Sequence, residues 1–133
     1  MLLNNYFVTI ILALLLAIVL KLITSKFSSH VVEFHKGISN GGMPSTHTAL
    51  ISSITAALYL NRGFDELFFL GLVLTMIVAS DAVKVRHNLG LQAEKLNTLL
   101  KKDKIPVVKG HNVSQVLVGV FIGILSALLV SLI

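Results

Sequence analysis

The chain has 133 residues, of which 55% are hydrophobic and only 13% are charged, and this composition is typical of a single membrane domain spanning residues 1–133 rather than of a soluble one. The absence of cysteine excludes a disulfide framework and a thiolate nucleophile or metal ligand. In so apolar a chain, the formal net charge of +5 favours anionic lipid headgroups or a phosphorylated substrate as partners over nucleic acid.

Four apolar runs predict four membrane-spanning helices. The first run, 6–23, and the last, 116–133, each have 18 residues, and helices of this length rise about 27 Å, close to the hydrocarbon thickness. Positive charge follows the first run instead of preceding it, which argues against a signal peptide. The middle runs are shorter, and we expect them to extend to 44–60 and from 65 past 81, with a hinge at "NRGFDE" between them.

Basic residues predict the orientation of these helices. Ten of the eleven lysines and arginines lie within 21–36 or 84–109, and the other is Arg62 in the hinge. By the positive-inside rule, the two basic loops are cytoplasmic and both termini lie outside, most simply in a cell inner membrane. The segment "LGLQAEKLNTLLKKDK" has the leucine pattern of an amphipathic helix on the cytoplasmic surface. The predicted fold class is therefore an all-α integral membrane protein with four transmembrane helices and a cytoplasmic amphipathic helix.

The segment "GGMPSTH" is the first of three polar motifs on the predicted cytoplasmic face. Gly41 and Gly42 provide a turn, and the hydroxyls of Ser45 and Thr46 lie beside the unpaired N–H groups of a helix start, which together favour an anion. The imidazole of His47 can exchange a proton with a phosphate ester oxygen. The alternative for this motif is a capped helix start with a surface histidine.

The segment "ASDAVKVRHNLG" is the second motif. The guanidinium of Arg86 suits the geometry of phosphate oxygens, and Asp81 either orients Arg86 or pairs with Lys84 three residues on. The alternative is a positive-inside cluster with an internal ion pair.

The third motif, "KGHNVSQVLVGVFIG", begins the last helix. Gln115 follows His111 by four residues, so that one helical turn can place the glutamine side chain against one imidazole nitrogen. The alternative is a polar interfacial histidine, which is also how we interpret His30, His35 and His87. No metal is expected, because the histidines do not have the spacing of a metal site and acidic partners are few.

Taken in order, these motifs resemble the divergent, small-membrane-protein branch of the type-2 phosphatidic acid phosphatase superfamily, which is related to acid phosphatases and vanadium-dependent haloperoxidases. The resemblance runs from about Leu15 to Gly123. It implies metal-free and cofactor-free hydrolysis of a lipid phosphate or diphosphate, such as a phosphatidate, a phosphatidylglycerol phosphate or an isoprenyl phosphate. It also implies that His111 attacks phosphorus and that His47 protonates the leaving oxygen.

The same resemblance implies a set of phosphate-binding groups. Ser45, with the N–H groups near it, and Arg86 match phosphate-binding positions of the superfamily motifs. Lys21 matches the lysine of the first motif, with Lys36 as its substitute.

Three features depart from the superfamily pattern. Gln115 stands where a carboxylate usually orients the nucleophilic histidine, and an amide cannot balance the charge of an imidazolium. Arg86 and His111, usually close in sequence, are 25 residues apart. The chain also has room for fewer helices than familiar members, so a homodimer could complete the fold, with Gly119 and Gly123 in G-x-x-x-G spacing as a candidate contact.

Two other functions are weighed against the phosphatase. Gln115 motivates a non-catalytic lipid-phosphate-binding or structural membrane subunit. A small transporter would need a central charge or a break within a run, and none of the four runs has a charge at its centre.

Overall fold

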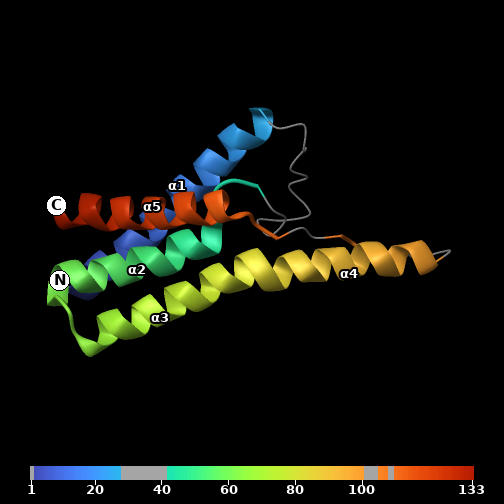
Figure 1. The fold of residues 1–133 in the computed structure, drawn as a ribbon. Coiled ribbons are helices and arrows are strands. Elements are labelled where there is room, and N and C mark those ends of the chain that lie inside the picture. The colour runs from blue at the N-terminus through green and yellow to red at the C-terminus, as the bar shows by residue number, and fades with distance from the viewer. Residues whose placement is uncertain (1, 28–41, 101–104, 108–109) are drawn as a thin grey trace.

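A computed structural model describes residues 2–27, 42–100, 105–107 and 110–133, and this part of the chain is helical without strands (Figure 1). The predicted all-α class is therefore confirmed. In chain order the elements are α1 (Leu2–Phe27), α2 (Thr46–Arg62), α3 (Glu66–Ser80), a π-helical turn η2 (Asp81–Val85), α4 (Arg86–Leu99) and α5 (Val113–Ser131).

Three helical stretches are long and apolar enough to cross a membrane: Asn5–Ser25, Glu66–Leu99 and Val113–Ser131. They make the chain an integral membrane protein. The helix α2 has 17 residues and rises about 26 Å, so its role as a fourth span stays a prediction, as does the side of the membrane on which each loop lies.

The amphipathic segment forms a helix, α4, and no loop separates this helix from α3. The elements α3, η2 and α4 form one continuous helix of 34 residues, and α4 extends beyond the bundle in Figure 1. This continuity arises because the backbone hydrogen bonds continue through the π-helical turn. Whether α4 lies on the membrane surface stays a prediction.

The hinge between α2 and α3 follows the expected local chemistry. Gly63 adopts a positive φ of 72° and its N–H donates to the carbonyl oxygen of Tyr59, which ends α2. Asp65 then caps α3 by accepting from the N–H of Phe68 at 2.8 Å, and its carboxylate pairs with Arg62. The predicted hinge is confirmed.

The start of α2 differs slightly from the prediction. Its first helical residue is Thr46, and Ser45 before it is extended with φ −72° and ψ 111°. Pro44 thus precedes the helix instead of occupying its first turn, and its side chain is buried. The short non-helical segment from Gly42 to Ser45 leaves the first N–H groups of α2 at the end of the bundle.

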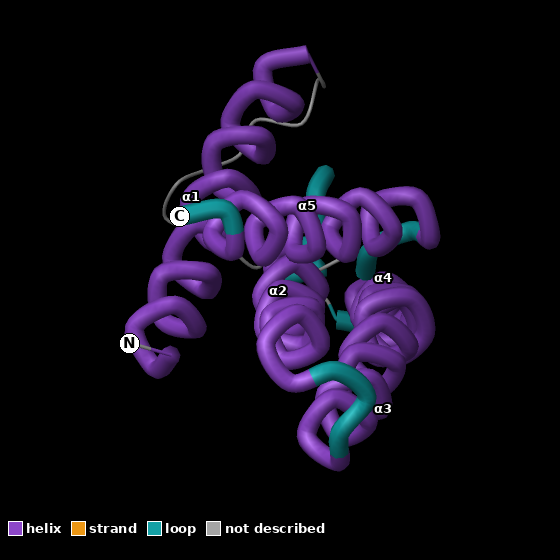
Figure 2. Tube along the Cα trace, turned by 90° about the vertical axis from the view of Figure 1, so that its left-hand side faces the viewer, coloured by secondary structure: helices purple, strands orange, loops and turns teal. Residues whose placement is uncertain are grey.

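The bundle has small residues inside and large apolar residues outside. Its core centres on Ala17, Ala49 and Ile122, whereas bulky side chains such as Phe69 and Phe121 are exposed. This is the reverse of a soluble domain and is typical of helices that pack closely in lipid. The helix α2 lies at the centre, since it contacts α1, α3 and α5 (Figure 2).

The closest helix contact is between α2 and α5. A Cβ atom added at Gly119 would collide with the hydroxyl of Thr48, and one added at Gly123 would collide with the hydroxyl of Ser52 and meet the carbonyl oxygen of Ala49. The same hydroxyls bond across the interface, from Thr48 to the Val116 carbonyl at 3.4 Å and from Ser52 to the Val120 carbonyl at 3.4 Å.

The G-x-x-x-G face predicted to allow close contact is therefore used within the chain. It faces α2, so the suggestion that it forms a homodimer contact was wrong, and any homodimer must use another face.

Gly123→Ala should lower the free energy of unfolding by about 1–3 kcal/mol, because the added carbon overpacks the α2–α5 contact. Thermal unfolding in detergent would measure this loss. Adding Ser52→Ala should not restore stability, because the carbon also meets the backbone at Ala49 and Ser53. Wild-type stability in either variant would contradict the close packing.

Candidate active site

Backbone hydrogen bonds hold the three polar motifs together. The N–H of Ser45 donates to the carbonyl oxygen of Gln115 at 3.0 Å, which joins the first motif to the third. The N–H of His111 donates to the carbonyl oxygen of Ala82 at 3.0 Å, which joins the third motif to the second. Both bonds join backbone groups, so neither of them uses a side chain of the motifs.

The π-helical turn η2 creates the second of these anchors. In an α-helix the N–H of Arg86 would bond to the carbonyl of Ala82, four residues earlier. Here it bonds to the carbonyl of Asp81, five residues earlier, and the released Ala82 carbonyl accepts the N–H of His111 instead. The wider turn also brings residue 86 over residue 81, where the Arg86 Nε and the Asp81 carboxylate form an ion pair at 2.8 Å.

Two glycines allow the loops to approach the helices. A Cβ at Gly110 would clash with the backbone of Ala82, Arg86 and His87, so this loop lies directly on the π-helical turn. Gly42 has a positive φ of 86°, and a Cβ there would lie 3.7 Å from Lys21 Cε. The buried Lys21 of α1 is thereby placed beside the first motif.

The first motif is also tied to α1. The hydroxyl of Thr24 donates to the carbonyl oxygen of Met43 at 2.6 Å. This bond holds the end of α1 beside the segment that leads into α2. Lys21 lies three residues before Thr24 in α1, so it is held near the first motif as well.

The hydrogen bonds of His111 define its tautomer. Gln115 Oε1 accepts the backbone N–H of Asn112 at 3.1 Å, which identifies this atom as the amide oxygen, and it also lies 3.1 Å from His111 Nδ1. The contact therefore requires that Nδ1 carry the proton. In the neutral ring Nε2 then keeps a free lone pair.

Burial lowers the pKa of His111 below its ordinary value of 6.5. The hydrogen bond with Gln115 acts in the opposite direction, and the positive charges of Lys21, Arg86 and protonated His47 lower the pKa further. Since only 8% of His111 is exposed, the neutral imidazole is the stable form at neutral pH.

Two hydroxyls at the start of α2 have no hydrogen-bond partner among the residues that the structure describes. The side chains of Ser45 and Thr46 are 0% and 4% exposed, respectively, and their oxygens bond to no other described group. A buried hydroxyl without a partner is costly. Beside the positive N-terminal end of α2, these two donors suit an anion.

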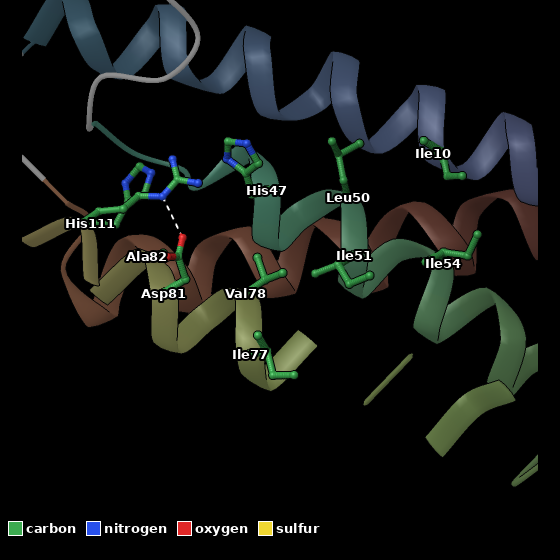
Figure 3. A pocket seen from close by; sticks show the side chains of 11 residues that line it. Ile10, His47, Leu50, Ile51, Ile54, Ile77, Val78, Asp81, Ala82 and His111 are labelled. Carbon is green, nitrogen blue, oxygen red and sulfur yellow. Dashed lines mark hydrogen bonds and ion pairs between the residues drawn. The ribbon is translucent and has the colours of Figure 1, made fainter. Parts of the chain in front are cut away.

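A groove of about 510 Å³ joins the polar motifs to the apolar interior. Its polar end is formed by His47, Asp81, Arg86 and His111. Figure 3 shows the imidazoles of His47 and His111 at the same end of the groove, with the ion pair of Asp81 marked beside them. Apolar side chains from three helices form the remainder: Ile10, Leu50, Ile51, Ile54, Ile77 and Val78, together with Ala82.

Most of the predicted site residues thus gather at one end of the bundle. His47, Arg86 and His111 line one groove, and the predicted contact between His111 and Gln115 is confirmed. Asp81 pairs with Arg86, which decides between the two partners expected for it. Lys36 and Gly41 lie outside the described residues.

Sequence reasoning missed two features of the site. One is Asn112, whose side chain accepts the N–H of Gln115 at 3.0 Å and completes a reciprocal capping box at the start of α5; its spacing of three residues from Gln115 is a recognisable signal. The other is the π-helical turn, for which the sequence carries no clear signal. Among the described residues, no group of three or more histidines and carboxylates could hold a metal ion.

The comparison with protein families gives a match over nearly the whole chain. The sequence model described as "Divergent PAP2 family", where PAP2 denotes type-2 phosphatidic acid phosphatase, matches residues 2–126. The chain belongs to the divergent PAP2 family. The resemblance drawn from the three motifs is therefore confirmed.

A relative of this divergent PAP2 protein has a curated description. The chain is similar to the uncharacterized membrane protein YuiD of Bacillus subtilis (strain 168), with 27% identity in an alignment 140 positions long that covers 90% of this chain and 89% of the relative. No solved structure matches the chain. The membrane location agrees with the relative's description.

Histidine NMR would test the tautomer and the pKa of His111. Because burial lowers its pKa, the neutral Nδ1–H form should persist as the pH falls through 6.5, and protonation should occur only at lower pH. Gln115→Glu should raise that pKa, since a carboxylate stabilises the imidazolium. An Nε2–H tautomer, or a pKa above 6.5 in the wild type, would contradict the assignment.

Exchanging Asp81 and Arg86 would separate a structural ion pair from an anion site. Asp81→Arg with Arg86→Asp can re-form the pair, which is partly exposed and worth up to about 1 kcal/mol, so thermal stability should stay near that of the wild type. Vanadate affinity should nevertheless fall roughly ten- to hundredfold, as expected for a lost charged hydrogen bond. Calorimetry with vanadate measures this, and wild-type affinity in the exchanged variant would make the pair purely structural.

Proposed function

We propose that this divergent PAP2 protein is a membrane phosphatase that hydrolyses a lipid phosphate or diphosphate through a phosphohistidine at His111. One observation carries the proposal: His47, Arg86 and His111 line the polar end of a groove whose other walls are apolar. A phosphate group fits the positive end, and an apolar tail fits the remainder.

In the first step, Nε2 of His111 attacks phosphorus while the bond from phosphorus to the ester oxygen breaks. The negative charge of the bound phosphate stabilises the protonated form of His47. His47 donates this proton to the leaving oxygen, so that the lipid leaves as an alcohol, or as a phosphate when the substrate is a diphosphate. The Gln115 amide oxygen holds the Nδ1–H and keeps Nε2 directed at the substrate.

In the second step, water attacks the phosphorus of the phosphohistidine. His47, now neutral, accepts a proton from this water as the bond between His111 and phosphorus breaks, and inorganic phosphate leaves. The cycle returns both histidines to their starting protonation states and uses only groups of the chain and water.

The negative charge on the phosphoryl oxygens is stabilised by positive groups and by donors. Arg86 and Lys21 supply the charge, and the hydroxyls of Ser45 and Thr46, which have no partner within the described part of the chain, donate to the phosphoryl oxygens. Lys36 is a further candidate from the sequence, and the proposal does not depend on it. The basic segments favour a site at the cytoplasmic leaflet.

A second function is favoured by Gln115. Without a carboxylate, the imidazolium character that develops on His111 is not balanced, and the same site would then bind a lipid phosphate without turnover. Activity gained by Gln115→Glu, from a wild type that only binds, would identify this function.

Phosphate release from lipid phosphates tests the enzyme directly. Purified protein in lipid nanodiscs with a metal chelator should release phosphate from phosphatidate, phosphatidylglycerol phosphate or an isoprenyl phosphate, and vanadate should inhibit it. His111→Ala should lower the rate at least about a thousandfold, because it removes the nucleophile.

His87→Ala is the matched control, because His87 is exposed on α4 and does not line the groove; it should keep the wild-type rate. Thermal unfolding would check that both variants are folded. Undiminished release by folded His111→Ala would contradict the phosphohistidine, and release by none of the three lipids would contradict the enzyme.

A further inference from the structure

The apolar part of the groove begins next to His47, the candidate proton donor. His47, Leu50, Ile51 and Ile54 line it at spacings of three and four residues, so they form one face of α2. The facing wall comes from Ile77 and Val78 of α3 and continues to Asp81 and Ala82 of η2. Figure 3 shows these α2 side chains extending from His47 away from His111.

The far end of the groove is closed by direct contact between α2 and α3. The hydroxyls of Thr55 and Thr75 are hydrogen bonded at 3.1 Å. One turn earlier in α3, Gly71 lies so close to α2 that a Cβ there would clash with the Thr55 side chain. The two helices are therefore in direct contact at Thr55, next to Ile54.

These limits give the groove a definite depth. The eight residues from His47 to Ile54 span about 10 Å along α2, a length that an extended chain of roughly eight carbons covers. At about 30 Å³ per carbon, the liquid volume of one water, one tail of eight carbons needs about 240 Å³, whereas two such tails need about 480 Å³ and would leave almost none of the groove for a phosphate. The groove, at about 510 Å³ including its polar end, has room for a phosphate and part of one chain.

The side of the groove faces the surrounding lipid. Ile77 is 58% exposed although it lines the groove, so a longer chain can leave between the helices at this point. The charge at the other end is net positive, because Arg86 and the nearby Lys21 outweigh the carboxylate of Asp81, and it complements a phosphate at neutral pH.

We infer that the groove binds one tail of a phosphorylated amphiphile and encloses roughly its first eight carbons between α2 and α3, with Ile54 as the residue that sets the depth. This inference rests on the proposed function for the position of the phosphate. It narrows the ligand class to single-tail phosphates, such as alkyl or isoprenyl phosphates, because a second chain finds no place in the groove.

A series of alkyl phosphates from ethyl to dodecyl, each below its micelle concentration, would test the depth. With protein in nanodiscs, kcat/KM and the binding constant from calorimetry should rise up to about fourfold for each carbon buried, and level off near octyl phosphate. Dioctanoyl phosphatidate should bind no more tightly than octyl phosphate.

Ile54→Trp should move the plateau to about five carbons, since the indole fills the distal end of the groove. Ile54→Ala should weaken octyl phosphate and leave ethyl phosphate unchanged, and it keeps the test valid if the larger side chain prevents folding. Ile124→Trp on α5, where the isoleucine is 43% exposed, is the matched control and should keep the wild-type profile.

The outcomes separate the two proposals. Hydrolysis without dependence on chain length, or a profile that Ile54→Trp and Ile54→Ala leave unchanged, would overturn the tail groove while leaving the phosphatase intact. Chain-length-dependent binding without phosphate release would overturn the phosphatase and support the groove. Tighter binding of dioctanoyl phosphatidate than of octyl phosphate would overturn the single-tail inference.

Discussion

The close packing of α2 against α5 is the contact on which the candidate site depends. Because Gly119 and Gly123 lack side chains, the two helices approach until hydroxyls of α2 reach carbonyls of α5. At this separation the N–H of Ser45 reaches the carbonyl of Gln115, which fixes the start of α2 beside the start of α5. His47 and His111 are thereby held at one end of the bundle. A wider helix separation would move the two histidines apart, whatever their own chemistry.

Arg86 and His111 are 25 residues apart in the sequence, and the π-helical turn connects their two segments. By moving the Arg86 N–H to the carbonyl of Asp81, it leaves the carbonyl of Ala82 for the N–H of His111. One local change in hydrogen bonding thus provides both the Asp81–Arg86 ion pair and the anchor of the third motif. Turns of this kind are frequent at functional sites. Here the turn leaves the Ala82 carbonyl to accept the N–H of His111.

The membrane environment gives the groove its two-part character. Small residues inside and bulky apolar residues outside are the arrangement expected when lipid replaces water around the bundle. The polar motifs cluster where the helices end, and the apolar part of the groove continues between α2 and α3, as the proposed lipid phosphate would require. Burial and nearby positive charge keep His111 neutral at this boundary, as a nucleophilic imidazole requires.

The sequence by itself determined the helical class, the hinge at Gly63 and Asp65, the three motifs and their family, because these follow from local composition and spacing. It also predicted the contact of His111 with Gln115, which one helical turn sets. Only the tertiary structure decided that α4 continues α3, that Gly119 and Gly123 face α2 within the chain, and that the Ala82 carbonyl anchors His111. The last two outcomes depend on contacts between residues that are distant in sequence. The free energy of these contacts comes from packing and from backbone groups that every residue shares, so a one-dimensional pattern does not specify the partners.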